Sequence, residues 1–145
     1  MRARSVEPRR RLALAALAAL ATVGCGRPCA PLAITRAGTS IVTLCAEEAR
    51  TEADLRRGLA GRAPLASDEA LVLVFPVEDE VCITNAGVDF AIDAAFVDAL
   101  GDVVAIEREI AARDETTRCH RPTARVVETA ASTLASVRVG DRVLP

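Results

Sequence analysis

The sequence is poor in lysine and in ring-bearing side chains: it contains no Lys, Trp or Tyr, three Phe and a single His, His120. One imidazole is too few for most catalytic metal sites, so we expect no metal and no other cofactor. All 18 basic residues are Arg, against 20 Asp and Glu, which gives a formal net charge of −2 at pH 7. This slightly acidic balance argues against a protein that binds nucleic acid.

Long hydrophobic runs are also missing. The uncharged run from Leu12 to Gly24 is about half as long as a membrane-spanning helix requires. It follows a basic head, Met1 to Arg11, and the two together predict a signal peptide over residues 1–24. Hydrophobic residues nevertheless make up 51% of the 145 residues, which excludes a disordered chain and fits one domain.

The end of the signal peptide and the residue after it, Thr22-Val23-Gly24-Cys25, are similar to a lipobox, where small or apolar residues precede an acylated Cys. We therefore expect an exported lipoprotein that faces the periplasm and is attached to a membrane by acyl chains on Cys25. Gly26 replaces the Asp that retains enterobacterial lipoproteins in the inner membrane, which favours the outer membrane. The alternative is ordinary secretion with Cys25 as a disulfide partner. Without residues 1–24 the net charge is −6, which argues further against nucleic acid.

Four cysteines remain, and export allows them to form disulfides. They are Cys29, Cys45, Cys82 and Cys119, and four cysteines permit three pairings. The preferred pairing is Cys29 with Cys45 and Cys82 with Cys119. His120 follows Cys119, so a thiol nucleophile with an adjacent base is an alternative, but sequence neighbours rarely point at one another. Structural disulfides are the favoured interpretation.

The rest of the chain predicts short strands and two short helices. We expect residues 25–37 to be the lipidated N-terminus and a tether, and residues 38–145 to be one globular domain. Apolar and β-branched runs predict strands near 40–45, 71–75, 90–97, 103–106 and 125–128, with a closing turn at Gly140-Asp141. A capping box that begins at Thr51 predicts a helix over 52–60, 132–136 suggests one helical turn, and 98–102 predicts a hairpin.

The apolar pattern disappears between Ala111 and Thr123, which predicts the longest loop. This segment and its end carry a cluster of basic side chains: Arg113, Arg118, His120, Arg121 and Arg125. Guanidinium groups bind carboxylates and phosphates, so the hypothesis is recognition of an anionic small molecule, a glycan or another envelope component. The alternative is a solvated loop that Asp114 and Glu115 partly neutralise.

Several segments, in their order along the chain, resemble the family known as domain of unknown function 192. They are Thr51 to Arg62, Val74-Phe75-Pro76, Ile92 to Asp98 and Val139 to Val143, and the resemblance covers residues 41–144. It implies a small, mainly β domain of the α+β class, built as a partly open barrel or mixed sheet with short helices. It implies no established activity.

One segment departs from that family. Its members usually carry Phe-Trp-Met, a basic residue and Asn-Thr at positions that here hold Ile83 to Val88, with Asn85 offset by two places. If the signature lines a ligand groove, this chain has lost the groove or binds something different. The alternative, which we favour, is that the missing Trp and Met were packing residues replaced by a smaller core, with a Cys82 disulfide in compensation.

No catalytic constellation is assembled in the sequence. Asp93 lies in an apolar strand, where a buried carboxylate that bonds backbone amides or Arg is favoured over a general base. The sequence therefore predicts a binding or interaction module of the cell envelope, with Asn85, Asp93, Arg118, His120 and Arg121 as candidate ligand-binding residues. The alternative is an enzyme that acts on an anionic substrate through Asp93 and the segment from Arg113 to Arg125.

Overall fold

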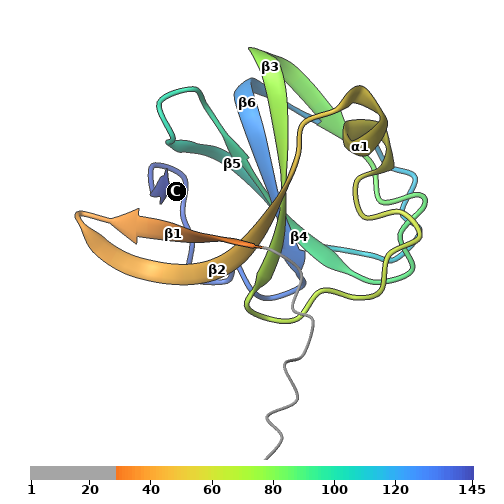
Figure 1. The fold of residues 1–145 in the computed structure, drawn as a ribbon, viewed down its shortest axis with the longest axis horizontal. Helices are drawn as coiled ribbons and strands as arrows, with labels where there is room; N and C mark the ends of the chain where they lie inside the picture. Colours follow the sequence, from red (N-terminus) through yellow and green to blue (C-terminus); the bar gives the residue numbers. More distant parts are fainter. Residues whose placement is uncertain (1–28) are drawn as a thin grey trace, which may run out of the picture.

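The computed structural model describes residues 29–145, so the predicted signal peptide and Cys25 lie outside the described residues. The elements are β1 (Ala30–Arg36), β2 (Thr39–Ala49), α1 (Glu52–Arg57), β3 (Glu69–Ile83), β4 (Ile92–Val97), β5 (Val103–Ile110), β6 (Arg118–Ala130) and β7 (Arg142–Leu144). The strands form one sheet in the order β5-β4-β6-β3-β2-β1-β7, which curls into a half-barrel (Figure 1). No helix within residues 29–145 is long and apolar enough to cross a membrane.

The predicted class, α+β and mainly β, is confirmed, but α1 is the one helix in the described part of the chain. The helical turn expected at 132–136 is a series of tight turns. Ser132 has a φ of 68°, which a right-handed helix does not allow. The N–H groups of Thr133, Ala135 and Val137 each bond a carbonyl three residues earlier, so no α-helical ladder forms.

The helix α1 lies in the connection between two parallel strands. β2 pairs with β3 in parallel, and such a pair needs a long crossover, here residues 50–68. As the capping box predicts, Thr51 is the N-cap: its hydroxyl oxygen accepts a hydrogen bond from the Asp54 N–H. Figure 1 shows that the crossover places α1 beside β3, away from β1 and β7.

The prediction of a tether over residues 25–37 is wrong for residues 30–36, which form the strand β1. A turn at Ala37-Gly38, where both φ values are positive at 48° and 80°, joins β1 to β2 as an antiparallel hairpin. Ala37 is not a residue that usually signals such a turn. Pro31 also argues against a strand, but it lies before the part of β1 that pairs with β7, so no hydrogen bond to β7 is lost there.

The two edge strands meet at one end of the sheet. An isolated bridge joins Asp102 to Arg142, and the Val103 N–H donates to the Asp141 carbonyl at 2.8 Å. The Arg36 guanidinium binds both carboxylate oxygens of Asp141, at 2.7 and 2.8 Å, and these hydrogen bonds lower the pKa of that carboxyl. This contact fastens β1 to the turn before β7. The hairpin predicted at 98–102 is confirmed as well, with Gly101 at a φ of 95°.

Apolar side chains form two clusters, one on each face of the curled sheet. The barrel cluster lies on the concave face and includes Ile34, Val72, Val97, Val127 and Val143. The helix-side cluster lies on the α1 face and includes Leu59, Leu71, Ala94, Phe96 and Val126. Neighbouring residues of β3, β4 and β6 alternate between the clusters, as a strand requires. These three strands are therefore covered on both faces.

The longest strands, β3 and β6, extend beyond their predicted limits. β3 continues past Pro76 because the pairing with β6 becomes irregular between Val74 and Asp79, so the missing proline N–H breaks no regular ladder. β6 begins at Arg118, so the loop predicted over 111–123 ends at residue 117. The start of β6 carries charged residues, so the apolar pattern of the sequence did not predict a strand there.

Both preferred disulfide pairings are present. Cys29 is bonded to Cys45 and Cys82 to Cys119, with Cα atoms 5.3 and 4.0 Å apart. The first ties the start of β1 to β2. The second links facing residues of β3 and β6, beyond the irregular segment at Pro76. Because Cys119 is in a disulfide, the alternative of a thiol nucleophile at that position is wrong.

We expect unreduced protein to show at most one free thiol. Replacing Cys82 and Cys119 by Ala should lower the free energy of unfolding by about 3 to 4 kcal/mol, because the disulfide closes a 37-residue loop. Urea unfolding of the variant and the wild type measures the difference. Replacing the Cys29–Cys45 pair, which closes a 16-residue loop, is the matched comparison. A second free thiol in the unreduced wild type would contradict the assignment.

Candidate functional site

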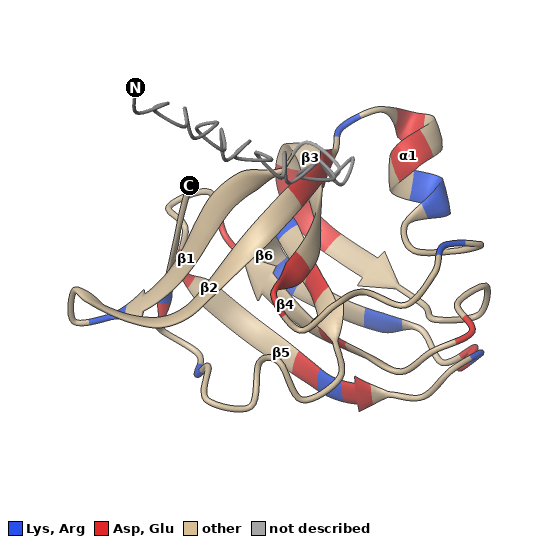
Figure 2. Ribbon diagram, turned by 60° about the horizontal axis from the view of Figure 1, so that its bottom comes forward, with Lys and Arg blue, Asp and Glu red and all other residues tan. Residues whose placement is uncertain are grey.

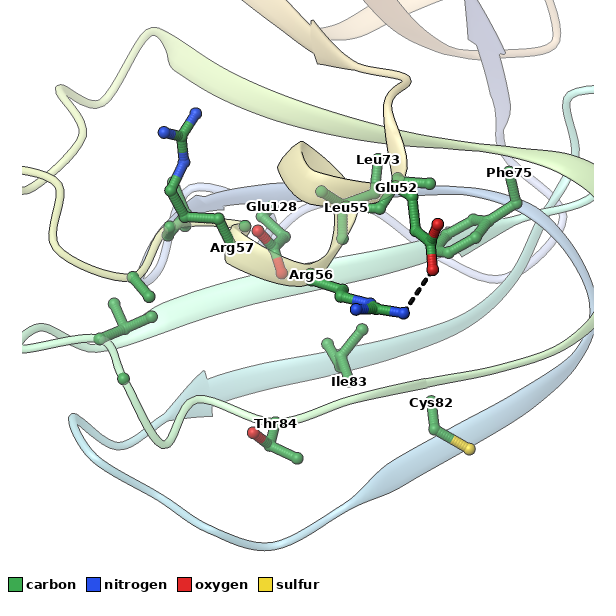
Figure 3. Close-up of a pocket in the computed structure, with 15 residues that line it drawn as sticks. Glu52, Leu55, Arg56, Arg57, Leu73, Phe75, Cys82, Ile83, Thr84 and Glu128 are labelled. Carbon is green, nitrogen blue, oxygen red and sulfur yellow. Dashed lines mark hydrogen bonds and ion pairs between the residues drawn. The ribbon is translucent and has the colours of Figure 1, made fainter.

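A pocket of about 410 Å³ lies between α1, β3 and the loop of residues 84–88 (Figure 3). Most of its wall is apolar: Leu55, Leu59, Leu73, Phe75, Ile83 and Val88. The polar groups that reach it are Glu52, Arg56, Arg57, Thr84 and Glu128. Its volume lies in the range of small-molecule sites, which are concave, mostly apolar and supplied with a few polar groups.

The pocket follows from the crossover between β2 and β3. α1 and the turn after it bring Leu55 and Leu59 onto the helix-side cluster, which holds the helix over the sheet. The loop of residues 84–88 approaches the same turn closely: a Cβ atom at Gly87 would come within 2.9 Å of the Ala60 Cβ. Glycine at this position therefore lets the loop form the opposite wall.

Glu128 is the buried charge of this pocket. It lies on β6 between Leu71 of β3 and Ala94 of β4, and both neighbours belong to the helix-side cluster. The residue is only 5% exposed. The Oε2 atom has no hydrogen-bond partner within residues 29–145, although an unpaired buried carboxylate is costly. Such an atom at the wall of a pocket is an unoccupied acceptor.

Burial raises the pKa of Glu128 to about 7, because an apolar environment disfavours the charged carboxylate. Arg62 opposes this shift by Coulomb attraction, but it makes no hydrogen bond to Glu128. Both Arg62 Nη atoms instead bind the carboxylate of Glu47, at 2.8 and 2.9 Å. At neutral pH, Glu128 is therefore close to its midpoint of ionisation.

The arginines at the pocket mouth already have acidic partners. Arg56 is paired with Glu52 one helical turn away, and Figure 3 shows this pair at the pocket. Arg57 is directed away from the other labelled side chains and binds Asp54 at 2.8 Å. Figure 2 shows the resulting mixture of acidic and basic residues along α1. The positive charge available for an anion is accordingly small.

Asn85, a predicted ligand-binding residue, holds a loop together. Its side-chain amide donates to the carbonyls of Phe90 and Ala111, at 3.0 and 2.8 Å, and its backbone N–H donates to Asp114. The residue is 0% exposed, and its Oδ1 is buried without a partner. Asn85 therefore anchors the loop, while its neighbour Thr84 lines the pocket.

Asp93 is a structural carboxylate, as the favoured interpretation of the sequence holds. It is 0% exposed, and its two oxygens accept hydrogen bonds from the backbone N–H groups of Glu109 and Leu134, at 2.8 and 2.9 Å. These bonds join β4 to β5 and to the turns before β7. No oxygen of Asp93 reaches the pocket described above.

The predicted basic cluster is neutralised over much of its length. Arg118 binds Asp114 at 2.8 Å and lies 3.4 Å from Glu107, which also pairs with His120 at 2.8 Å. The pKa of Asp114 is lowered to about 2 by hydrogen bonds from Thr116, together with Arg118. Figure 2 shows acidic and basic residues alternating on the neighbouring β5.

Two side chains of the cluster are mostly exposed. Arg113, at 75%, binds Asp89 at 2.7 Å, and Arg121, at 68%, has its nearest carboxylate oxygens, on Glu80 and Asp79, at 3.6 and 3.9 Å. The cluster and the pocket do not share a residue. Within residues 29–145, no group of three or more His, Cys, Asp or Glu side chains is placed to hold a metal ion.

Sequence reasoning missed Glu128. A charged residue after Val126 and Val127 looks like the exposed end of a strand. The alternation of side chains along a strand does not tell whether this residue points to a buried or an exposed face. The missing signal was long-range: β6 lies between β3 and β4 with both faces covered, so every residue in this stretch is buried. Leu55 and Leu59 were recognisable as one helical face, but not as the wall of a pocket.

Comparison with known proteins gives a family and a fold. The family model DUF192, described as an uncharacterized ACR, matches residues 33–144. No curated protein matches the chain. A solved protein of unknown function from Novosphingobium aromaticivorans has a TM-score of 0.76 and 24% identity, over 81% of this chain and 85% of its own. A candidate transcription regulator from Sinorhizobium meliloti has a TM-score of 0.74 and 23% identity, over 79% and 91%.

Glu128 should make stability fall as pH rises. The pKa is raised from 4.5 to about 7 on folding, so the folded state binds the proton more tightly and loses this advantage as Glu128 ionises. Between pH 5 and 8 the wild type should lose about 2 to 3 kcal/mol of unfolding free energy relative to Glu128→Gln. Urea unfolding across this range measures the difference.

The exposed Glu115→Gln variant is the matched control and should follow the wild type. Parallel pH profiles for the wild type and Glu128→Gln would contradict the buried, unpartnered state of Glu128.

Proposed function

This chain belongs to the DUF192 family, whose function is not defined, and from that premise we propose that it is a lipid-anchored cell-envelope domain that binds a small molecule. The observation that carries the proposal is the pocket beside α1, where Glu128 Oε2 lies buried without a partner. A ligand that donates a hydrogen bond would satisfy this atom and remove the cost of leaving it unpaired.

The segment that departs from the family signature supports the same pocket. Of the positions that hold Ile83 to Val88, four line the pocket: Ile83, Thr84, Gly87 and Val88. Ile83 and Val88 are buried, in keeping with a packing role, whereas Thr84 and Gly87 are exposed and small. The proposal is that these small side chains leave space for a ligand in this chain.

Export and anchoring are supported by two features. The N-terminal residues have the pattern of a signal peptide and a lipobox ending at Cys25. The two disulfides of the folded part suit an oxidising compartment such as the periplasm. We propose that acyl chains on Cys25 hold the domain at a membrane, with the outer membrane as the favoured one.

A binding role is favoured over catalysis at the residues that the sequence suggested. An enzyme acting through Asp93 would need a free carboxylate oxygen, and both are bonded to backbone N–H groups away from solvent. Recognition of an anionic envelope component at the basic cluster is disfavoured, because Arg113, Arg118 and His120 are paired with acidic side chains and Arg121 lies 3.6 and 3.9 Å from two more. We therefore propose the pocket, and not the basic cluster or Asp93, as the ligand site.

Lipidation at Cys25 is directly testable. In a host that matures lipoproteins, the wild type should incorporate labelled palmitate and sediment with membranes, and Cys25→Ser should lose both properties. Thr22→Leu, which strengthens the lipobox, is the control and should behave like the wild type. An unlabelled wild type released in soluble form would reject the anchor and leave the secreted alternative.

Ligand binding is tested by blocking the pocket. A thermal-shift screen of the full chain in detergent, against envelope metabolites, sugars, nucleotides and metal ions, should yield ligands that stabilise it, by about 2.7 kcal/mol at 100 times Kd. The exposed wall residue Thr84 offers a blocking variant, Thr84→Trp, which should abolish the stabilisation. Thr39→Trp, at an exposed position in the β1–β2 hairpin and outside the pocket lining, is the matched control. Equal stabilisation of both variants would place the ligand elsewhere.

A further inference from the structure

The polar groups of the pocket differ in whether they are already paired. Glu128 Oε2 is a buried acceptor with no partner in the described part of the chain. The two cations of α1 are bound to carboxylates of the same helix, Arg56 to Glu52 and Arg57 to Asp54. The interior of the pocket thus presents one unsatisfied negative group and apolar side chains.

We propose that the pocket takes a small organic cation, an apolar body with a primary or secondary ammonium group that donates a hydrogen bond to Glu128 Oε2. This inference rests on the proposed function, because it names the ligand class of the same pocket. The apolar body would lie against Leu55, Phe75 and Ile83. An ammonium paired with a buried carboxylate gains a charge-assisted hydrogen bond, the stronger kind.

A residue without a side chain lies between the pocket and the acceptor. Gly58, the C-cap of α1, lines the pocket next to Glu128, and a Cβ atom there would lie 3.7 Å from Oε2, in van der Waals contact. Because glycine has no side chain, no protein atom fills that position, and it is where we propose that the ligand approaches Oε2. The nearest protein cation in the Coulomb field, Arg62, does not fill it, since its guanidinium is bound to Glu47.

Two other ligand classes fit the pocket less well. A carboxylate or phosphate would meet the negative Glu128 and find the arginines of α1 already paired. A metal ion prefers several oxygen, nitrogen or sulfur ligands, and no such group of side chains occurs within residues 29–145. A neutral hydrogen-bond donor remains as an outcome of the test.

The ionisation of Glu128 gives the proposal a second readout. The charged groups that face it are Arg62 from the turn after α1 and Glu52, Arg56 and Arg57 from α1 itself. Its neighbours on β3 and β4, Leu71 and Ala94, carry no charge. With the pKa of Glu128 near 7, affinity for an ammonium ligand should fall about 30-fold from pH 8.5 to 5.5, because the carboxylate is protonated at the lower pH.

Three probes with one apolar body test the head group: cyclohexylmethylammonium, cyclohexylmethanol and cyclohexanecarboxylate. Their affinities for the full chain in detergent are measured by NMR titration at pH 8.5. The ammonium probe should bind about 10- to 100-fold more tightly than the alcohol, the gain expected for one hydrogen bond to a charged group. Glu128→Gln should abolish this preference and leave the alcohol within about twofold, while Glu115→Gln should behave like the wild type.

The outcomes separate the two proposals. If the alcohol or the carboxylate shifts the pocket residues as strongly as the ammonium does, the inference is overturned and small-molecule binding at the pocket stands. If neither these probes nor any compound of the screen changes the NMR chemical shifts of the pocket residues, both proposals fail. An ammonium preference that survives in Glu128→Gln reflects the overall negative charge of the protein and overturns the inference. The pH series on the wild type, with the alcohol as its control, tests the same point without a substitution.

Discussion

The pairing of β6 with β3 on one side and β4 on the other is the constraint on which the rest of the structure depends. It places β6 in the interior of the sheet, where both faces are covered by apolar clusters. The residues of β6 from Val126 to Thr129 are therefore buried, whichever face of the sheet their side chains point to. Glu128 is consequently held as a carboxyl group among hydrocarbon side chains, at the wall of the pocket beside α1.

The parallel pairing of β2 with β3 supplies the other half of the site. An antiparallel pair could be joined by a tight turn, whereas this pair needs a crossover, and the crossover contains α1. Covering the sheet with so short a helix leaves part of the helix-side cluster uncovered, and the loop of residues 84–88 closes it only partly. The pocket is thus a product of the topology, while its chemistry comes from Glu128.

Local features were predictable from the sequence because neighbours in the chain determine them. The Thr51 cap and the turn at 98–102 are of this kind. Features that depend on distant partners were not predictable in the same way. β1 is a strand because it pairs with β2 and β7, and the charged start of β6 is a strand because it pairs with β3. Glu128 is buried because β6 lies between β3 and β4. The candidate site belongs to this second group. The sequence therefore predicted a ligand site at the basic cluster, whose residues are close together in the chain.

The Cys29–Cys45 disulfide has a mechanical consequence if the chain is anchored at Cys25. Tension on the anchor would enter the fold at Cys29 and pass through the covalent bond into the middle of β2. β1 would then be bypassed, and its hydrogen bonds would not be pulled apart one after another like a zipper. The load would reach β2, an interior strand of the sheet that pairs with β3.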